Sequence, residues 1–256
     1  MVNMSSLQAL IFDVDGTLSD TERDGHRVAF NQAFEQAGLD WNWSVELYGQ
    51  LLSVTGGKER MAYYLEKFNT DFPTDSSTPQ MIKELHASKT IHYTELLSTG
   101  AIPLRPGVKR LIQEARDNNM RIAISTTTTP ANVTALLEHA LEKGSTEWFE
   151  VIAAGDIVPA KKPAPDIYNW ALKKLKLEAK DCLAFEDSLN GVKSSLGADL
   201  KTIITINDYT KADDFSGASL VLDQMGEPDS PFTTLAGNNH GASYLNLDLL
   251  YKIHAS

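Results

Sequence analysis

The stretch Leu10-Ile-Phe-Asp-Val-Asp-Gly-Thr-Leu18 decides the fold, because in it an apolar run ends abruptly at two carboxylates. The short run Ala9–Phe12 predicts a strand that is buried on both faces. Asp13 and Asp15 are two residues apart, so in extended backbone their side chains point to the same side. Two carboxylates this close repel each other unless they share a proton or a cation lies between them. The pair favours a functional site, although Asp and Gly are also turn residues that would simply close a strand.

Composition and charge restrict the class of protein. The chain has 256 residues, 42% of them hydrophobic, which suffices for one large core or two smaller ones. Its net charge of −11 argues against a nucleic acid or an anionic membrane as partner, because phosphate-rich surfaces attract basic proteins. The single cysteine, Cys182, excludes a disulfide framework and suits a reducing compartment. No stretch approaches the ~20 apolar residues of a membrane span, and Met1–Ser6 lacks an apolar signal core. We therefore expect a soluble, cytoplasmic, globular protein.

The chain after the first strand begins with a helical block. A charged connection, Asp20–His26, precedes an apolar stripe at helical spacing that Gly38 ends. No strand pattern of comparable quality occurs before about Ser98. The helices expected in this block are Val28–Ala37, Val45–Val54, Lys58–Phe68 and Pro79–Leu97.

Beyond the Gly/Pro-rich junction Gly100–Gly107, helices and short apolar strands alternate. This alternation predicts βαβ units and a mostly parallel sheet with helices on both faces. From Asp223 the pattern fades, and only one helix near Leu245–Ile253 is expected. The expected helices are Val108–Asn118, Pro130–Leu141, Asp166–Leu175 and Leu189–Leu196, and the expected strands are Arg121–Ser125, Phe149–Ala154, Cys182–Phe185, Lys201–Ile206 and Ser219–Leu222.

The first strand has no partner within the helical block, so we expect it to join the later sheet. The predicted fold is α/β: a doubly wound parallel-sheet core, formed by residues 1–18 plus 99–256, with an all-helical cap domain, residues 19–98, inserted after the first strand. The chain shows no internal repeat and no low-complexity tract.

Polar side chains follow three of the predicted strands, at the point where each strand ends. Asp13 and Asp15 follow the first strand, a hydroxyl run begins at Ser125, and Glu186-Asp187 follows Cys182–Phe185. Because parallel strands end at the same edge of a sheet, and ligands bind beyond that edge, these groups should converge. The segment Val158–Asp166, which contains two lysines, lies between them in the sequence.

This set of residues has a chemical logic. Carboxylates without a sulfur or histidine companion form an oxygen-rich site that suits Mg²⁺ better than zinc. Magnesium usually binds through a few carboxylates, waters and a substrate phosphate. A hydroxyl and a lysine are the donors expected around the other phosphate oxygens. A carboxylate that faces the phosphorus can act as nucleophile, so phosphoryl transfer to Asp is the economical hypothesis.

Each element also has an ordinary structural interpretation. Glu186-Asp187-Ser188 and Thr129-Pro130 are typical helix starts, and Lys161 or Lys162 alone is typical of a solvated surface lysine. The isolated histidines are taken as surface or packing residues: His26, His86, His92 and His139. The agreement of order, spacing and strand-end placement favours the functional interpretation.

The motifs resemble, in order, the four signatures of the haloacid dehalogenase-like superfamily. They are Asp13-Val-Asp-Gly-Thr17, the strand-end Thr126, Lys162-Pro163 and Glu186-Asp187. The helical insertion resembles the cap of β-phosphoglucomutase-like members. Three further segments resemble the CbbY-like branch: Val54-Thr-Gly-Gly-Lys-Glu-Arg60, Leu104-Arg-Pro-Gly107 and Ala123-Ile-Ser-Thr-Thr-Thr-Thr-Pro-Ala-Asn132. The branch implies a sugar-bisphosphate phosphatase acting on xylulose 1,5-bisphosphate.

The resemblance also implies a role for each motif residue. Asp13 would be the nucleophile, and Asp15 the acid that protonates the leaving alcohol and then the base that activates water. The Asp15 backbone carbonyl and the Asp13 and Asp187 carboxylates would hold Mg²⁺, with Glu186 near the metal or its waters. The two groups that would bind phosphoryl oxygens are Thr126, the residue directly after Ser125, and Lys162, selected by the Lys-Pro-x-Pro pattern. In this chain the connection Glu22–His26 is one residue longer than in relatives.

The cap is expected to choose the substrate, because the strand-end motifs recognise only the transferred phosphoryl group. Gly57 belongs to a candidate anion loop, and Lys58, Arg60 and Arg105 are candidate ligands of a second phosphate. An ordinary interhelical turn with solvated cations is the alternative.

Three functions are compatible with the motifs. The leading hypothesis is a Mg²⁺-dependent sugar phosphatase that works as a monomer. A phosphomutase shares the same motifs and is the second hypothesis. A non-catalytic sugar-phosphate binder is the third, and it is disfavoured because a binder has no need of both Asp13 and Asp15.

Overall fold

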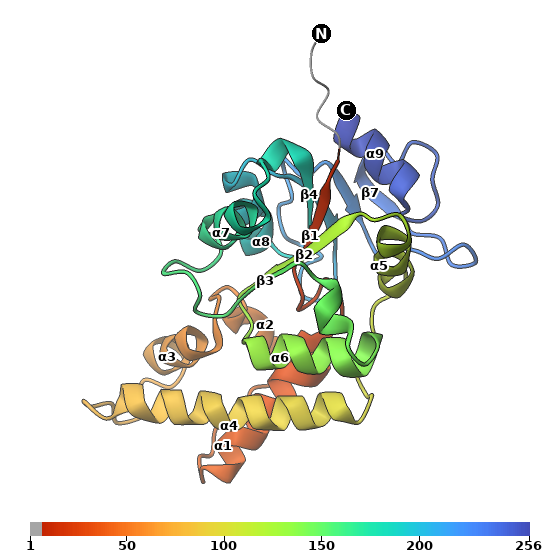
Figure 1. Ribbon diagram of the computed structural model, residues 1–256. Helices are drawn as coiled ribbons and strands as arrows, with labels where there is room; N and C mark the ends of the chain where they lie inside the picture. Colours follow the sequence, from red (N-terminus) through yellow and green to blue (C-terminus); the bar gives the residue numbers. More distant parts are fainter. Residues whose placement is uncertain (1–6) are drawn as a thin grey trace.

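The computed structural model describes residues 7–256, so the expectation for Met1–Ser6 lies outside it. A seven-stranded sheet runs in the order β3-β2-β1-β4-β5-β6-β7. The first six strands are parallel, and β7 is antiparallel to β6. The prediction of an α/β, mostly parallel, doubly wound sheet is confirmed (Figure 1). The strands are β1 (Ala9–Phe12), β2 (Arg121–Thr126), β3 (Val151–Ala154), β4 (Cys182–Glu186), β5 (Lys201–Thr205), β6 (Leu220–Leu222) and β7 (Thr234–Gly237).

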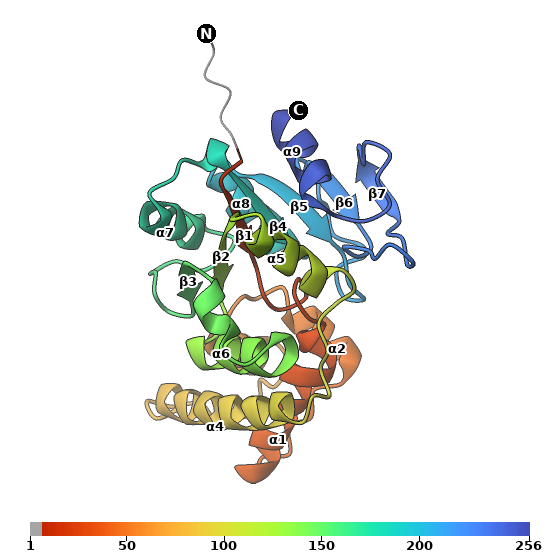
Figure 2. The same ribbon diagram turned by 45° about the vertical axis from the view of Figure 1, so that its right-hand side comes forward.

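Helices cover both faces of this sheet (Figure 2). Leu10 and Phe12 of β1 belong to an apolar cluster with side chains of α5 (Val108–Asp117) and α9 (Leu247–Ala255). Ala9 and Ile11 belong to a second cluster, with side chains of α7 (Asp166–Leu175). Alternate residues of β1 therefore serve opposite faces, which is why the strand is a continuous apolar run. The remaining helices of this unit are α6 (Pro130–Leu136), α8 (Leu189–Gly197), a π-helix Leu137–Leu141, and short 3₁₀ turns at Ser145–Trp148 and Ala179–Asp181.

The helical unit lies beyond one end of the strands (Figure 1). It consists of a π-helix, Glu22–His26, and of α1 (Arg27–Gln36), α2 (Val45–Leu51), α3 (Gly57–Lys67) and α4 (Thr78–Ser98). These helices bury an apolar cluster of their own that is rich in aromatic rings, among them Phe30, Phe34, Trp41, Trp43 and Tyr48. A separate core is what an inserted domain requires. The domain boundaries at residues 18–19 and 98–99 stay a prediction.

Two segments differ from the sequence prediction. Asp20–His26, expected as a charged connection, contains the π-helix Glu22–His26, which runs directly into α1. Gly25 permits this path, because a Cβ there would lie 2.7 Å from Cδ1 of Ile102. Strand β7 was not expected, because its four residues are mostly exposed and so show no apolar alternation. The strand forms because it pairs with β6, across a register shift, and its own sequence does not indicate this.

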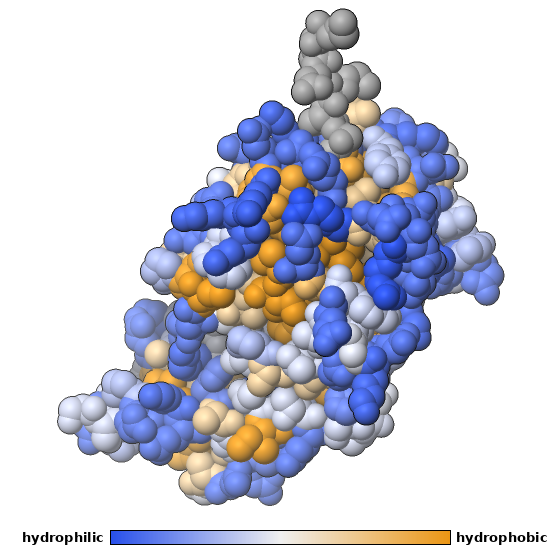
Figure 3. Space-filling view, viewed as in Figure 1, coloured by the Kyte–Doolittle hydropathy of each residue, from blue (hydrophilic) through white to orange (hydrophobic). Residues whose placement is uncertain are grey.

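The surface offers no membrane-crossing element in the described part of the chain, since none of its helices is both long and apolar enough. Most of the face in Figure 3 is hydrophilic, with an apolar area in the upper half, over the sheet unit. The large exposed apolar side chains are scattered over separate elements, which is normal for a protein surface. They are Phe68, Ile91, Ile157, Leu235 and Tyr251.

Candidate active site

The ends of β1, β2 and β4 bring the predicted site residues together. Phe12, the last residue of β1, is in register with Ile124 of β2 and with Phe185 of β4. The residues that follow these positions therefore share one edge of the sheet, which faces the helical unit. Between them lies a cavity of about 300 Å³. Its lining includes Asp13, Asp15, Glu22, Arg60, Thr126, Thr127, Lys162, Glu186, Asp187, Asn207 and Tyr209.

Lys162 lies at the centre of a buried cluster of charges. Its Nζ donates to Oδ1 of Asp13 at 2.7 Å, to Oε1 of Glu186 at 2.5 Å and to the carbonyl of Ser125 at 2.9 Å. Lys161, in contrast, lies in ion pairs with Glu59 and Asp156 at the boundary with the helical unit. The structure therefore places Lys162, the lysine of the Lys-Pro-x-Pro pattern, beside Asp13. Lys162 donates to Oδ1 of Asp13, whereas the hydroxyl of Thr17 makes a weak 3.4 Å contact with the second oxygen, Oδ2.

The negative charge that the carboxylates can carry exceeds the positive charge of Lys162. Burial and the nearby Glu186 raise the pKa of Asp13 to about 7, even though Lys162 opposes this shift. Burial, Asp13 and Glu186 raise the pKa of Asp187 well above its ordinary value. Although burial favours the neutral amine, Asp13 and Glu186 raise the pKa of Lys162 above its ordinary value. One lysine therefore does not neutralise the carboxylates of this cluster.

The donor set fits a divalent cation. Carboxylate oxygens of Asp13, Glu186 and Asp187 lie within 4.8 Å of one another, and all three residues are buried. Oε2 of Glu186 is buried and has no hydrogen-bond partner among the described residues. Three hard oxygen donors in a site short of positive charge suit Mg²⁺. The Asp15 carboxylate points elsewhere, so its predicted part in metal binding rests on its backbone carbonyl alone.

The Asp15 carboxylate faces the helical unit and is held by two donors. Oδ1 lies 2.8 Å from Nε2 of His26, and Thr21 donates to the same oxygen at 2.6 Å. Nδ1 of His26 lies 2.7 Å from Nζ of the buried Lys89. Burial alone would raise the pKa of Asp15, but His26, Thr21 and Lys89 together lower it well below its usual range.

The interpretation of His26 as an isolated surface or packing residue was therefore wrong. Its ring is buried, stacked on Tyr93, and paired with Asp15. The wider turn of the π-helix explains how this contact forms. In it the N–H of Arg27 donates to the carbonyl of Glu22, five residues back. A π-turn absorbs one extra residue in a helix, which matches the additional residue predicted in the Glu22–His26 connection.

A second hollow adjoins the first on the side of the helical unit. It has a volume of about 440 Å³ and shares Asp15, Glu22, Arg60 and Thr127 with the first cavity. Gly57, Lys58 and Arg60, the candidate substrate residues of the helical unit, all line it. The other basic side chains of its lining are His26, His86, Lys89 and Lys161.

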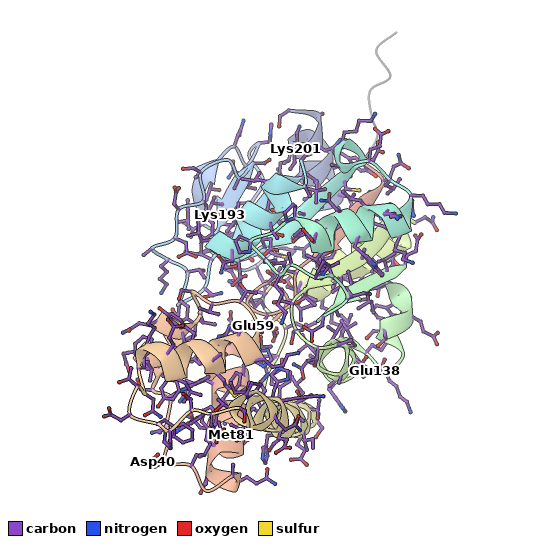
Figure 4. The ribbon with its side chains drawn as sticks, turned by 90° about the vertical axis from the view of Figure 1, so that its left-hand side faces the viewer. Asp40, Glu59, Met81, Glu138, Lys193 and Lys201 are labelled. Atoms are coloured by element: carbon purple, nitrogen blue, oxygen red, sulfur yellow. The ribbon has the colours of Figure 1, made fainter. Side chains whose placement is uncertain are left out.

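The basic groups of the second hollow differ in their pairing. Lys58 forms an exposed ion pair with Asp156 at 2.5 Å, whereas Arg60 is buried and donates to the hydroxyl of Tyr48 at 2.7 Å. Burial lowers the pKa of Lys89 to about 8 despite the nearby Asp15 and Glu22, so the amine is still charged at neutral pH. In Figure 4, Glu59, the residue between Lys58 and Arg60, lies where α3 faces the sheet unit.

Arg105 does not belong to the second hollow, so its proposed role as a phosphate ligand was wrong. Its guanidinium is buried and donates to backbone carbonyls, namely those of Gly16, Thr205, Ile206 and Asp223. Asp20 lies 3.3 Å from its Nε. These partners leave Arg105 a role in holding loops of the sheet unit together.

The hydrogen-bond partners of Glu186 and Asp187 were also missed at the sequence level. Tyr168 donates to Oε1 of Glu186 at 2.5 Å, and Asn207 donates to Oδ2 of Asp187 at 2.6 Å. In the sequence, Tyr168 cannot be told from the other residues on the apolar face of α7. Asn207 carried a usable signal, because it directly follows the expected strand Lys201–Ile206, as the other site residues follow their strands.

A family model for haloacid dehalogenase-like hydrolases matches residues 7–199. The chain belongs to the haloacid dehalogenase-like hydrolase family. Within this family it is similar to CbbY proteins. CbbY of Rhodobacter capsulatus is 50% identical, over 83% of this chain and 91% of the relative. The plasmid CbbY protein of Cupriavidus necator is 46% identical, over 88% of each chain.

Solved structures share the fold of this chain. A crystal structure of a CbbY variant from Rhodobacter sphaeroides in complex with xylulose 1,5-bisphosphate has a TM-score of 0.79 and 43% identity. The match covers 85% of this chain and 94% of that one. β-Phosphoglucomutase of Clostridium difficile, with a TM-score of 0.68, 22% identity and 85% and 91% of the two chains covered, shares the fold. The predicted resemblance to the CbbY-like branch is confirmed, and so is the prediction of an enzyme, a phosphoric monoester hydrolase.

Proposed function

We propose that this haloacid dehalogenase-like hydrolase is a Mg²⁺-dependent phosphatase of a sugar bisphosphate, and that its reaction passes through a phosphorylated Asp13. The observation that carries this proposal is the pairing of two hollows. One contains Asp13, Lys162 and the carboxylate cluster, and the adjoining one is lined by basic side chains. A substrate with phosphates at both ends of a short sugar matches such a pair.

In the first half-reaction, Oδ2 of Asp13 attacks the phosphorus and the bond from phosphorus to the sugar oxygen breaks. Lys162 donates to Oδ1, so that Oδ2 is the oxygen left to attack, and the positive charge of Lys162 and the hydroxyl of Thr126 would stabilise the phosphoryl oxygens. A Mg²⁺ ion held by Asp13, Glu186 and Asp187 would supply positive charge that offsets the repulsion between carboxylate and phosphate.

Asp15 moves the proton in both half-reactions. Next to an anionic phosphate its pKa rises, so it can carry a proton and pass it to the leaving sugar oxygen. In the second half-reaction the Asp15 carboxylate takes a proton from water, whose oxygen attacks the phosphorus and releases Asp13. His26 and Thr21 fix the carboxylate throughout, because both contact Oδ1 and leave Oδ2 for the proton.

The relatives support the choice of substrate. A CbbY variant from Rhodobacter sphaeroides has been crystallised with xylulose 1,5-bisphosphate, and a more distant relative from Thermotoga maritima is a phosphorylated-carbohydrate phosphatase. We therefore propose xylulose 1,5-bisphosphate as the first substrate to test. A phosphomutase is less well supported, because the β-phosphoglucomutase structure from Clostridium difficile shares the fold at only 22% identity.

The test is a phosphate-release assay with xylulose 1,5-bisphosphate, a matching sugar monophosphate and glucose 1-phosphate, each with Mg²⁺. We expect inorganic phosphate from the bisphosphate, no isomer formation from glucose 1-phosphate, and loss of turnover in EDTA that excess Mg²⁺ restores. Asp13→Asn is the control, and it should abolish turnover while the chain still binds substrate. Isomer formation without phosphate release would identify a mutase, and unchanged activity of Asp13→Asn would overturn the nucleophile.

A further inference from the structure

Asn207 contacts one of the three carboxylates of the candidate metal site. Its Nδ2 donates to Oδ2 of Asp187 at 2.6 Å. Asp187 is buried, and its ligand atom lies within 4.8 Å of those of Asp13 and Glu186. Asn207 itself is not a member of that acidic group, so any effect it has on a metal ion must act through Asp187.

The loop after β5 fixes the orientation of this amide. The N–H of Tyr209 donates to Oδ1 of Asn207 at 2.9 Å, so the oxygen end of the amide is engaged within the loop. The N–H of Asn207 donates to Oγ1 of Thr210 at 3.0 Å, and the N–H of Thr210 donates to the carbonyl of Asn207 at 3.1 Å. Since Oδ1 has a backbone donor, the hydrogen-bond network assigns Nδ2 to the side of Asp187.

The backbone around the pair is built to hold it. Gly16 has a φ of +84°, and a Cβ at this position would lie 2.1 Å from Oδ2 of Asp187 and 2.7 Å from Nδ2 of Asn207. The pair therefore occupies a slot that exists only because Gly16 has no side chain. Arg105 donates to the carbonyls of Gly16 and Ile206, so one guanidinium ties both walls of this slot together.

We propose that Asn207 is a positioning residue for the bound cation: its amide holds Oδ2 of Asp187 and so fixes the orientation in which that carboxylate would bind the metal. The proposal rests on the proposed use of Mg²⁺. A carboxylate without this donor can rotate, and its full rotational freedom is then lost only when the ion binds. Donors that orient a metal ligand in this way typically contribute about 10- to 100-fold in metal affinity.

The experiment measures Mg²⁺ binding to the substrate-free chain by calorimetry, with Mg²⁺ alone as the probe. Asn207→Ala removes both hydrogen bonds of the amide. Asn207→Ser keeps an oxygen that can accept from the Tyr209 N–H, but it is too short to reach Asp187. We expect both variants to bind Mg²⁺ about 10-fold more weakly than wild type, and Asn207→Gln, which retains an amide donor, to recover part of the loss.

Ser216→Ala is the matched control, because it removes an exposed side-chain hydrogen bond, to Asp214, in the same segment between β5 and β6 and leaves every contact of Asn207 in place. Its dissociation constant for Mg²⁺ should equal that of wild type, whatever its effect on thermal stability. The proposal is overturned if Asn207→Ser binds Mg²⁺ as tightly as wild type, or if Ser216→Ala weakens binding as much as Asn207→Ser does. Because no substrate is present, these outcomes are separate from the phosphate-release assay, whose failure would overturn the activity instead.

Discussion

Nε2 of His26 lies 2.8 Å from Oδ1 of Asp15, across the boundary between the helical unit and the sheet unit. Asp15 follows β1, whereas His26 ends the π-helix at the start of the helical unit. Asp15, the proposed acid and base, is thus oriented by a residue of the helical unit. Any change in that unit that displaces His26 should reach the chemistry of the site through this contact.

His26→Ala should lower kcat by about 100-fold, which is the lower end of what a positioned acid or base contributes. The variant leaves Asp13, Lys162 and the metal carboxylates in place, so Mg²⁺ affinity should change little. The measurement is steady-state phosphate release, with circular dichroism to confirm the fold. His92→Ala, at a histidine that contacts Gln36 away from both cavities, is the control. Equal kcat values for the two variants would remove His26 from this role.

The second hollow gives a prediction about substrate choice. Lys58→Ala should raise KM for a sugar bisphosphate by about 10-fold, because one charge-assisted hydrogen bond to phosphate is lost, and it should leave KM for a monophosphate unchanged. Asp156→Asn is a matched control, because it breaks the same 2.5 Å ion pair but keeps the lysine. A similar rise in KM with both variants, or with both substrates, would show that Lys58 only fastens the two units together.

Arg105→Met tests the structural role that replaced the predicted phosphate contact. The substitution leaves the carbonyls of Thr205, Ile206 and Asp223 without the guanidinium donor, the first in a buried and the other two in a partly buried position. We expect the free energy of unfolding in urea to fall by about 3 kcal/mol, since a buried polar group without a partner costs ~1–3 kcal/mol. Arg23→Met, at a half-exposed arginine, should change it by less than about 0.5 kcal/mol. A normal stability of Arg105→Met combined with a raised KM would restore Arg105 as a ligand.

Much of the fold followed from the sequence because the sheet is buried on both faces. A run such as Ala9–Phe12 must be apolar at every position to serve two clusters, and this produces a strong signal. Strand β7 gave no signal, because it is exposed and is ordered by its pairing with β6. Glu22–His26 looked like a connection because it is charged and contains Gly25, and the sequence does not show that Ile102 and Tyr93 pack against that glycine.

The site was predictable where a residue's role depends on its place at the end of a strand. Asp13, Thr126, Glu186 and Asp187 needed only the strand boundaries and the parallel order of the sheet. His26 and Lys89 were not predictable in this way, because the contact between them depends on how the helical unit packs over the strand ends of the sheet. Arg105 was misread for a related reason: a cation near a phosphate loop and a cation that bonds buried carbonyls have the same appearance in a sequence.

Cys182 provides a last prediction, which concerns the sheet unit alone. The thiol lies at the start of β4, where it is 1% exposed, and it is the single cysteine of the chain. Burial, with the nearby Asp181, raises the pKa of Cys182 to about 12. Because the thiolate is the reactive form, only about one thiol in 10⁴ is ionised at pH 8, against roughly a quarter for an ordinary cysteine.

The native chain should therefore resist iodoacetamide at pH 8, as measured by intact-mass spectrometry, whereas the chain in urea should gain one carbamidomethyl group at the rate of a free thiol. The native rate should rise with pH up to about 12, where the buried thiol ionises. It should also rise with urea in parallel with unfolding, since only the opened sheet exposes β4. Labelling that is equally fast with and without urea would show that the start of β4 is open to solvent in the native chain.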